Sequence, residues 1–472
     1  MTDAAETEIP EWFRAEAFTD DMPGESPDLV FRGQLRIAYR LAAEHADKLM
    51  YVHGLGWHWW YGNRWVEDHT GRAAQRVYSV IRAAHAEAFR DDKLAADVRA
   101  CQSANGVDGV LRLASKLEAF AFTHDDLDAD AYLLNVANGT LDLRTMELRA
   151  HDPRDRITKV CRASYDPGAA GPVWDAFLRR SLPDEDVRAF LQRYIGQALA
   201  GRTMEHALAI LTGTGRNGKG VWCGAVNKAL GSYATSVRPD LLLARDGAHT
   251  TDEMDLMGVR WVTMSEIEQG RALAEATMKR LTGGDTIRAR RMRQDSVAFE
   301  PSHTLAMVAN HLPKTSGNDE AVWKRLKVVP FEVVIPAAEQ DPRLDEKLGL
   351  ELEAVLAWIV AGWQEYRRLG LADPDKVRAR TAAYRDDSDG LALFIMDNCV
   401  TGDGANVPLD ALWRAWERWA NAAGFIRQAA TKREFSKAME ARGFVQGKSG
   451  GSRTWKRIGL KTDMDEPLSG WG

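Results

Sequence analysis

The sequence predicts an α/β protein whose central domain is built on a parallel sheet. Two observations carry this prediction. Apolar runs of strand length alternate with helical stretches between about residues 205 and 335. The first run, residues 207–212, leads directly into a glycine-rich segment and then into a helical pattern. Further runs that predict strands lie at residues 259–265, 304–309 and 327–331.

The composition limits the class of protein. Hydrophobic residues make up 45% and charged residues 28% of the 472 residues, as in a soluble chain of several domains. The four cysteines show no C-x-x-C spacing, so we expect a reducing, cytoplasmic setting and no zinc module. Apolar runs stay well short of the roughly 20 residues that a membrane span needs, and we expect no membrane partner. The net charge of −6 does not favour nucleic-acid binding by the whole chain, so local charge must decide.

The glycine-rich segment has the pattern of a phosphate-binding loop. Glycines let backbone N–H groups turn toward a phosphate, and the helix that follows adds the positive end of its dipole. A lysine adds a charge for the β- and γ-phosphates. The segment therefore predicts an ATP site, with an incidental glycine-rich turn as the alternative. Its residues are Gly213, Thr214, Gly215, Arg216, Asn217, Gly218, Lys219 and Gly220.

Position 220 departs from the usual pattern. A serine or threonine normally follows the lysine and binds Mg²⁺ through its hydroxyl, but here the residue is Gly220. The metal must then be held from another element. We choose Glu266, which follows the strand at 259–265, because a carboxylate there can hold Mg²⁺ through water and orient the attacking water. Glu268 is the reserve, and a surface acid is the alternative for both. Asn310 ends the next strand, where its amide can contact the γ-phosphate or the attacking water.

The region before the loop predicts two segments. Residues 1–30 are acidic and aperiodic, which predicts a flexible tail. Residues 31–180 predict an α+β domain, with a tryptophan-rich hairpin at 57–66 whose rings we expect in a core rather than on nucleic-acid bases. Asp126, Asp128 and Asp130 could form the metal site of a primase, but we favour a solvated acidic loop because no second acidic strand with suitable partners follows.

The loop lies within a predicted ATPase domain over residues 181–385, which is followed by a second domain over 386–460 and a short flexible tail over 461–472. Apolar residues at helical spacing between 344 and 363 predict one packed helix. The block 386–460 shows a tryptophan-rich helix, a cationic helix and two strands around a Gly/Ser turn, the layout of a winged helix. A protein-docking domain is the alternative. The candidate phosphate contacts of the predicted winged helix are Lys432, Arg433, Lys437 and Lys456.

Five motifs in order resemble one known family. They are G-T-G-R-N-G-K-G at 213–220, W-V-T-M-S-E at 261–266, K-R-L-T-G-G-D at 279–285, L-A-M-V-A-N-H-L-P at 305–313 and W-K-R-L-K-V-V-P-F at 323–331. The chain is similar to superfamily 3 helicases of the phage/plasmid primase family, which are related to the poxvirus primase-helicase. The resemblance extends over about residues 40–460 and includes L-L-N-V-A-N-G-T-L-D-L at 133–143 and Y-I-G-Q-A-L-A-G at 194–201.

This resemblance implies an AAA+-like ATPase that forms a homo-hexameric ring and translocates on single-stranded DNA at forks or origins. ATP and Mg²⁺ would be its cofactors, and the setting would be phage or plasmid replication in the cytoplasm of a bacterial host. Glu266 would serve the metal, Asn310 would be the sensor, and Arg325 would be the arginine finger, with Lys324 as runner-up. A hairpin over 286–299 would track DNA through Arg288, Arg290, Arg291 and Arg293.

Two other functions stay open at this point. A primase-helicase would need catalytic metal at the three aspartates; without it, primers would come from a separate primase. A DNA-binding initiator or regulator with weak ATPase is favoured by the missing hydroxyl at Gly220. Stimulation of ATP hydrolysis by single-stranded DNA separates this third function from a helicase.

Overall fold

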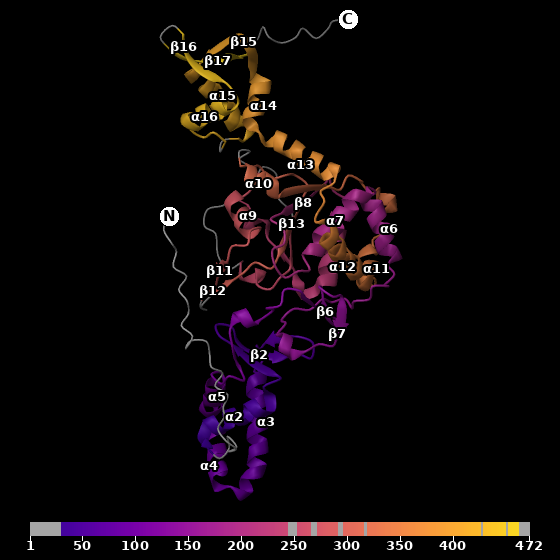
Figure 1. Cartoon of the computed structure of the whole chain (residues 1–472), viewed down its shortest axis with the longest axis vertical. Coiled ribbons are helices and arrows are strands. Elements are labelled where there is room, and N and C mark those ends of the chain that lie inside the picture. Colours follow the sequence, from indigo (N-terminus) through magenta and orange to yellow (C-terminus); the bar gives the residue numbers. More distant parts are fainter. Residues whose placement is uncertain are drawn as a thin grey trace. The chain divides into compact units, whose positions relative to one another are not determined.

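The computed structural model describes residues 30–243, 253–265, 271–290, 296–315, 319–425, 428–449 and 452–461 (Figure 1). Both predicted tails therefore lie outside the described residues, except at their inner ends. The chain divides into two compact units, one of residues 1–61 and 65–126 and the other of 62–64 and 127–472. The division after Asp126 falls inside the region 31–180 that the sequence groups as one domain.

In its described residues, the first unit combines a small sheet with the α-helices α2 to α5 (Figure 1). The tryptophan hairpin forms as predicted, with Trp59 opposite Val66 and Trp60 opposite Trp65. Trp65 is buried, and Trp57 and Trp59 pack against the hydrophobic core, so these rings serve the core. The sheet order is β3-β2-β1-β4. The elements are α2 (Gly33–His45), β1 (Leu49–Val52), β2 (Gly56–Trp60), β3 (Trp65–Glu67), α3 (Arg72–Glu87), α4 (Asp92–Cys101), α5 (Ala104–Ala114) and β4 (Ala121–Phe122).

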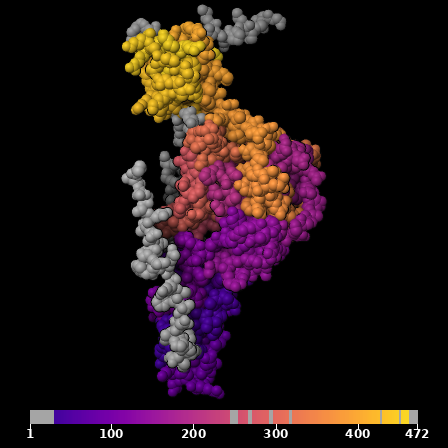
Figure 2. Space-filling model, viewed as in Figure 1, coloured from indigo at the N-terminus to yellow at the C-terminus, as the bar shows by residue number. Residues whose placement is uncertain are grey.

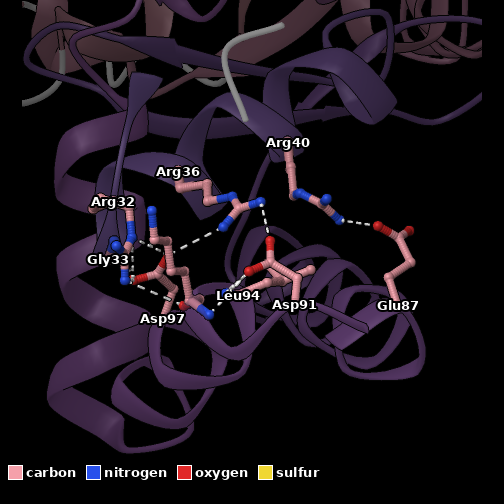
Figure 3. Close-up of polar contacts among 9 residues, drawn as sticks. Arg32, Gly33, Arg36, Arg40, Glu87, Asp91, Leu94 and Asp97 are labelled. Carbon is pink, nitrogen blue, oxygen red and sulfur yellow. Dashed lines mark hydrogen bonds and ion pairs between the residues drawn. The ribbon is translucent and has the colours of Figure 1, made fainter. Parts of the chain in front are cut away.

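Ion pairs tie α2 to α4 in this unit (Figure 3). Asp97 is buried and accepts from the Arg32 side chain at 2.9 Å and from the Gly33 backbone N–H at 2.8 Å. Arg36 reaches both Asp97 and Asp91, and Asp91 also caps α4. These contacts keep the pKa of Asp97 below its usual range despite burial. These ion pairs and hydrogen bonds hold the start of α2 against α4.

The second unit begins with an antiparallel sheet of β5 (Leu133–Val136), β6 (Gly139–Asp142) and β7 (Glu147–Arg149). Its buried residues belong to the same core cluster as the helices that follow. That shared core explains why residues 127–180 group with the second unit. The helices are α6 (Pro172–Ser181) and α7 (Glu185–Gln197).

The central sheet has five parallel strands in the order β14-β8-β13-β10-β9. Four of them are the strands expected from the apolar runs, and only β9 was missed. The prediction of an α/β fold with a parallel sheet is confirmed. The bounds are β8 (Leu208–Thr212), β9 (Ala234–Val237), β10 (Trp261–Ser265), β13 (Thr304–Ala309) and β14 (Leu326–Pro330). The other elements of this region are α8 (Lys219–Leu230), α9 (Glu275–Leu281), β11 (Ile287–Ala289), β12 (Val297–Phe299) and α10 (Glu320–Arg325).

The prediction of a single helix between 344 and 363 is wrong in one respect. The structure has two helices there, α11 (Leu344–Gly349) and α12 (Leu352–Leu369). The break places Glu351 against the start of α6, where its carboxylate accepts from the backbone N–H groups of Val173 (3.1 Å) and Trp174 (2.8 Å). Capping another helix is a tertiary contact that periodicity does not report.

The C-terminal part contains helices and one antiparallel sheet of order β15-β17-β16. Its core holds Phe394, Trp416, Phe435 and Trp455, all buried. The two helices and two strands expected here are present, and α14 and β15 were missed. Figure 2 shows the surface of this part in orange to yellow. The elements are α13 (Asp375–Ser388), α14 (Gly390–Asn398), β15 (Cys399–Pro408), α15 (Leu409–Ala423), α16 (Lys432–Ala441), β16 (Val445–Ser449) and β17 (Ser452–Leu460).

Helices α7 and α12 touch through their backbones, behind the central sheet. A Cβ added at Gly196 would lie 2.3 Å from the carbonyl carbon of Gly362, and one at Gly362 would lie 2.1 Å from the Gln192 carbonyl oxygen. Both helices contribute buried residues to the same core as the strand β8. The glycine of the Y-I-G-Q motif therefore has a packing role.

Gly362→Ala should lower the free energy of unfolding by about 1–3 kcal/mol, because the added methyl forces the two helices apart in a packed core. Thermal unfolding followed by circular dichroism measures the change. Gly349→Ala is the matched control, since a Cβ there meets no atom within 4 Å. Equal unfolding temperatures for both variants would contradict the close-packing account.

Candidate functional site

The glycine-rich segment forms a loop between the carboxyl end of β8 and the start of α8. Three of its residues have left-handed backbone: Gly215 (φ 101°), Arg216 (φ 50°) and Gly218 (φ 87°). Gly218 is the residue that caps α8, and it lacks a side-chain cap. Left-handed residues beside a helix amino terminus turn backbone N–H groups toward one point, which is an arrangement suited to an anion.

Lys219 is buried within this loop and its ammonium group is held by three oxygens. Its Nζ donates to the Gly213 carbonyl (2.8 Å), the Asn217 Oδ1 (3.1 Å) and the Asn310 Oδ1 (3.3 Å). Only 4% of the residue is exposed, and burial lowers the pKa of the ammonium group. All three contacts are neutral oxygens. A buried cation with only neutral partners favours a nearby anion.

Asn310 meets Lys219 because two parallel strands end at the same edge of the sheet. β8 pairs with β13 in register, Thr212 beside Ala309, so residues 213 and 310 leave the sheet together. Asn310 itself is exposed. The structure thus brings together the predicted phosphate lysine and the predicted sensor amide.

Strand β10 lies on the other side of β13 and ends at the same edge, with Ser265 beside Val308. The predicted metal residue Glu266 and its reserve Glu268 come directly after β10 and lie outside the described residues. Within the described part of the chain, no group of three or more His, Cys, Asp or Glu side chains could hold a metal ion.

Gly220 has open space where a side chain would stand. A Cβ built there meets no atom within 4 Å, whereas one at Gly218 would lie 2.5 Å from the Ser181 Oγ. The missing hydroxyl at position 220 is therefore not enforced by packing against the described residues.

Gly220→Ser should fold normally and bind ATP at least as well as the wild type, because the added side chain has room and supplies the hydroxyl that such loops use for Mg²⁺. Half-maximal ATP hydrolysis should need less Mg²⁺, as measured in a magnesium titration. Gly218→Ser is the contrasting variant and should lose binding, since its φ is 87° and its side chain would clash. Loss of ATP binding in Gly220→Ser would mean that the bound nucleotide itself approaches this backbone closely.

Arg325 lies at the opposite edge of the sheet from the loop. It is the last residue of α10 and directly precedes β14, whose first residue Leu326 pairs with Leu208, the first residue of β8. The loop begins five residues later along these strands, about 16 Å away. The Arg325 Nη1 donates to the Ala321 carbonyl at 2.9 Å, and its Nε is buried without a hydrogen-bond partner among the described residues. Lys324, the runner-up, is exposed.

The predicted hairpin is present as β11 and β12, with Ile287 opposite Phe299. Ile287 and Ala289 are buried, and Arg288 and Arg290 are exposed. The other two predicted arginines, Arg291 and Arg293, and the predicted turn lie outside the described residues. Helix α9 anchors the chain before the hairpin: Lys279 pairs with Asp319 at 2.7 Å and Arg280 with Glu253 at 2.6 Å.

The predicted DNA contacts of the C-terminal part differ in their surroundings. Arg433 and Lys437 are exposed on α16, and Lys456 on β17 is half-buried. Lys432 forms an ion pair with Asp410 and is the least available of the four. Arg442 binds both carboxylate oxygens of Asp389 at 2.6 Å and so connects α16 to the start of α14.

The three aspartates of the alternative primase site serve local structure. Asp126 accepts from the backbone N–H and the hydroxyl of Thr123, both at 2.8 Å. Asp128 accepts from the backbone N–H and the hydroxyl of Thr158. Asp130 forms an ion pair with Arg144, which keeps the pKa of the carboxyl low despite partial burial. These bonds favour the acidic-loop interpretation.

Residues 38–183 match the family described as "D5 N terminal like", and residues 211–325 match DUF5906, a family of unknown function. A "Putative helicase" of Acanthamoeba polyphaga mimivirus is 27% identical over 302 residues, 59% of this chain and 32% of the relative. A "Putative primase" of African swine fever virus (strain Badajoz 1971 Vero-adapted) is 24% identical over 346 residues, 66% of this chain and 36% of the relative. This chain is therefore similar to proteins named putative helicases and putative primases, and its residues 38–183 resemble the D5 N-terminal-like family. The resemblance inferred from the five motifs is confirmed.

The relatives are longer than this chain, which spans about a third of the length of each. One solved structure, the A form apo structure of the NrS-1 C terminal region, superposes with a TM-score of 0.52 at 12% identity. It covers 91% of this chain and all of that one, and it supports the fold alone. No helix among the described residues is long and apolar enough to cross a membrane.

One contact of the site was not foreseen from the sequence. Asn217 was expected only as a member of the loop, yet its side chain also reaches the carbonyl of Phe331, which follows β14. The sequence shows only that the fifth residue of the loop has an amide side chain, which can both donate and accept hydrogen bonds. Nothing in the sequence indicates which strand it contacts.

Proposed function

We propose that this chain is an ATP-dependent DNA helicase of replication. The observation that carries the proposal is the buried Lys219, whose hydrogen-bond partners among the described residues are neutral oxygens at the edge where the β8 loop and the β13 amide meet. The helicase names of the relatives support the same function. In this proposal the parallel sheet is an AAA+-like ATPase core over residues 181–385, preceded by a helicase-associated domain over 31–180 and followed by a winged helix over 386–460.

Each predicted residue then has a role at the sheet edge. The loop N–H groups and Lys219 bind the β- and γ-phosphates, and Lys219 leaves its neutral partners for the charged oxygens. Asn310 senses the γ-phosphate. Glu266 holds Mg²⁺ through water and orients the attacking water. Mg²⁺ would neutralise charge that develops on the phosphates.

The position of Arg325 supports a homo-hexameric ring in this proposal. An arginine finger stabilises the charge of phosphoryl transfer only where it reaches the γ-phosphate. Because Arg325 lies at the far edge of its own sheet, it serves the loop of a neighbouring subunit in this proposal. The exposed cations Arg288 and Arg290, with Arg291 and Arg293, would then line a channel for single-stranded DNA, and forked or origin DNA would be the substrate.

Two alternatives remain, each with one observation behind it. A primase-helicase is favoured by the primase name of one relative, although the three aspartates are engaged in local bonds. An initiator with weak ATPase is favoured by Gly220. Phage or plasmid replication in a bacterial host stays part of the proposal, as does a separate primase partner; the curated relatives reported above come from large DNA viruses.

The test of the proposal mixes two inactive variants. Lys219→Ala should abolish ATP hydrolysis, and Arg325→Ala should lower it by about 10³-fold or more. A mixed ring contains interfaces where an intact loop faces an intact finger, so hydrolysis should partly return on mixing. Lys324→Ala is the matched control and should hydrolyse ATP normally.

No recovery in mixed rings whose formation is confirmed by native mass spectrometry would mean that Arg325 acts within its own subunit or is structural. Wild-type-like hydrolysis by Lys219→Ala would remove the nucleotide site altogether.

Removing the exposed cations of α16 should weaken DNA binding. The double variant Arg433→Ala, Lys437→Ala should reduce the slope of log affinity against log salt by about 1.4–1.8, the value for two lost phosphate contacts. Fluorescence anisotropy with single-stranded and forked DNA measures this slope. Basal ATP hydrolysis should not change. The control removes the same charge at Arg343 and Arg368, which belong to exposed ion pairs elsewhere. If the control variant loses as much DNA affinity and salt slope as the α16 variant, the C-terminal part is a protein-docking domain instead.

A further inference from the structure

Asn217 joins the phosphate loop to the end of strand β14. Its side chain is 97% buried; the Nδ2 donates to the Phe331 carbonyl at 3.1 Å, and the Oδ1 accepts from the Lys219 Nζ at 3.1 Å. The chemistry of the two neighbours fixes the orientation of the amide, because a carbonyl needs a donor and an ammonium group needs an acceptor. One amide therefore contacts both the phosphate lysine and the exit of a neighbouring strand.

The segment after β14 is also bound to the end of β8 and to the loop residue directly before Asn217. The Phe331 backbone N–H donates to the Thr212 carbonyl at 2.8 Å, and the Ile335 N–H donates to the Arg216 carbonyl at 2.9 Å. Gly213 makes room for this arrangement. A Cβ there would lie 2.1 Å from the Asn217 Nδ2 and 2.3 Å from the Phe331 carbonyl oxygen. The first glycine of the motif is thus required by the Asn217–Phe331 bond.

Strand β14 carries two functional groups, one at each end. Arg325 precedes its first residue, and Phe331 follows its last. The strand lies at the edge of the sheet and pairs only with β8 among the described strands. Its other side contacts α13, where the Thr381 hydroxyl accepts from the Val328 backbone N–H at 3.0 Å. A change at Phe331 can therefore reach Arg325 along one short strand.

We propose that Asn217 is a positioning residue that couples the nucleotide state of its own loop to the arginine finger that serves the next subunit. This inference rests on the proposed function. When a bound phosphate accepts hydrogen bonds from the Lys219 ammonium group, the Oδ1 of Asn217 loses its donor. The hydrogen bond from the Asn217 Nδ2 to the Phe331 carbonyl then changes. The end of β14 responds, and Arg325 at the other end is repositioned. Binding in one subunit is thereby reported to its neighbour.

The test asks whether Asn217 affects a site in another subunit. Arg325→Ala subunits keep an intact loop and lack a finger, so each needs the finger of its neighbour. They are mixed with Asn217→Ala subunits, whose own loop is impaired but whose Arg325 is unchanged. The matched control replaces Asn217→Ala by Asn310→Ala, which also removes one oxygen from Lys219 but leaves the bond to Phe331 in place.

The expected result is recovery of ATP hydrolysis with Asn310→Ala subunits and about fivefold or more lower recovery with Asn217→Ala subunits, the effect of one lost buried hydrogen bond. Equal recovery in the two mixtures would overturn the coupling and confine Asn217 to its own loop. Asn217→Asp is the second variant: it keeps the shape and a contact with Lys219, replaces the donor to Phe331 by a charged acceptor oxygen, and should recover as poorly as Asn217→Ala.

Failure of the proposed function gives a different pattern. If the chain has no ATPase, or if Lys219→Ala and Arg325→Ala subunits do not complement each other in mixed rings, the finger proposal itself fails. If that pair complements and both asparagine variants also do so equally, only the coupling fails.

Discussion

The candidate site depends on a single buried ammonium group and the oxygens around it. Transfer of a charge out of water is costly unless partners replace the water, and the three partners of Lys219 are all neutral. They come from the start of the loop, from Asn217 within it and from Asn310 at the end of β13. Charged phosphate oxygens are stronger partners for an ammonium group than amide or carbonyl oxygens are. The lysine is therefore held in place for an anionic ligand.

The parallel sheet makes this arrangement possible. Its strands run in one direction, so the loop after β8 and the amide after β13 leave the sheet at the same edge. The same topology places Arg325 at the other edge, since it precedes a strand that runs beside β8. The loop after β8 and Arg325 before β14 are therefore separated by the length of one strand. A helicase ring uses this separation in the proposed mechanism, because each subunit offers its loop to one neighbour and its finger to the other.

Much of this could be predicted from the sequence because the signals are local. The central strands are apolar runs bounded by glycine, polar residues and turns, and four of five were found this way. The loop residues and Asn310 follow from motifs with a fixed spacing. Strand β9 was missed, since Ala234–Val237 contains serine and threonine and has no buried alternation to mark it.

The contacts that sequence reasoning missed are those between distant segments. Glu351 interrupts a periodic helix in order to cap α6, and no helical pattern reports the position of another helix. Asn217 contacts Phe331, 114 residues away. The region 31–180 divides because residues after 126 share a core with helices α7, α8 and α12, which is decided by packing.

The central claim is that the loop around Lys219 recognises the β- and γ-phosphates of a nucleotide. Isothermal titration of the chain with a non-hydrolysable ATP analogue and with AMP, both in Mg²⁺, tests it most directly. The account predicts that the ATP analogue binds at least about 100-fold more tightly than AMP, since charged hydrogen bonds to the lysine and to the loop N–H groups exist only with the outer phosphates. Equal affinity for the two ligands, or no binding of the ATP analogue, would contradict it.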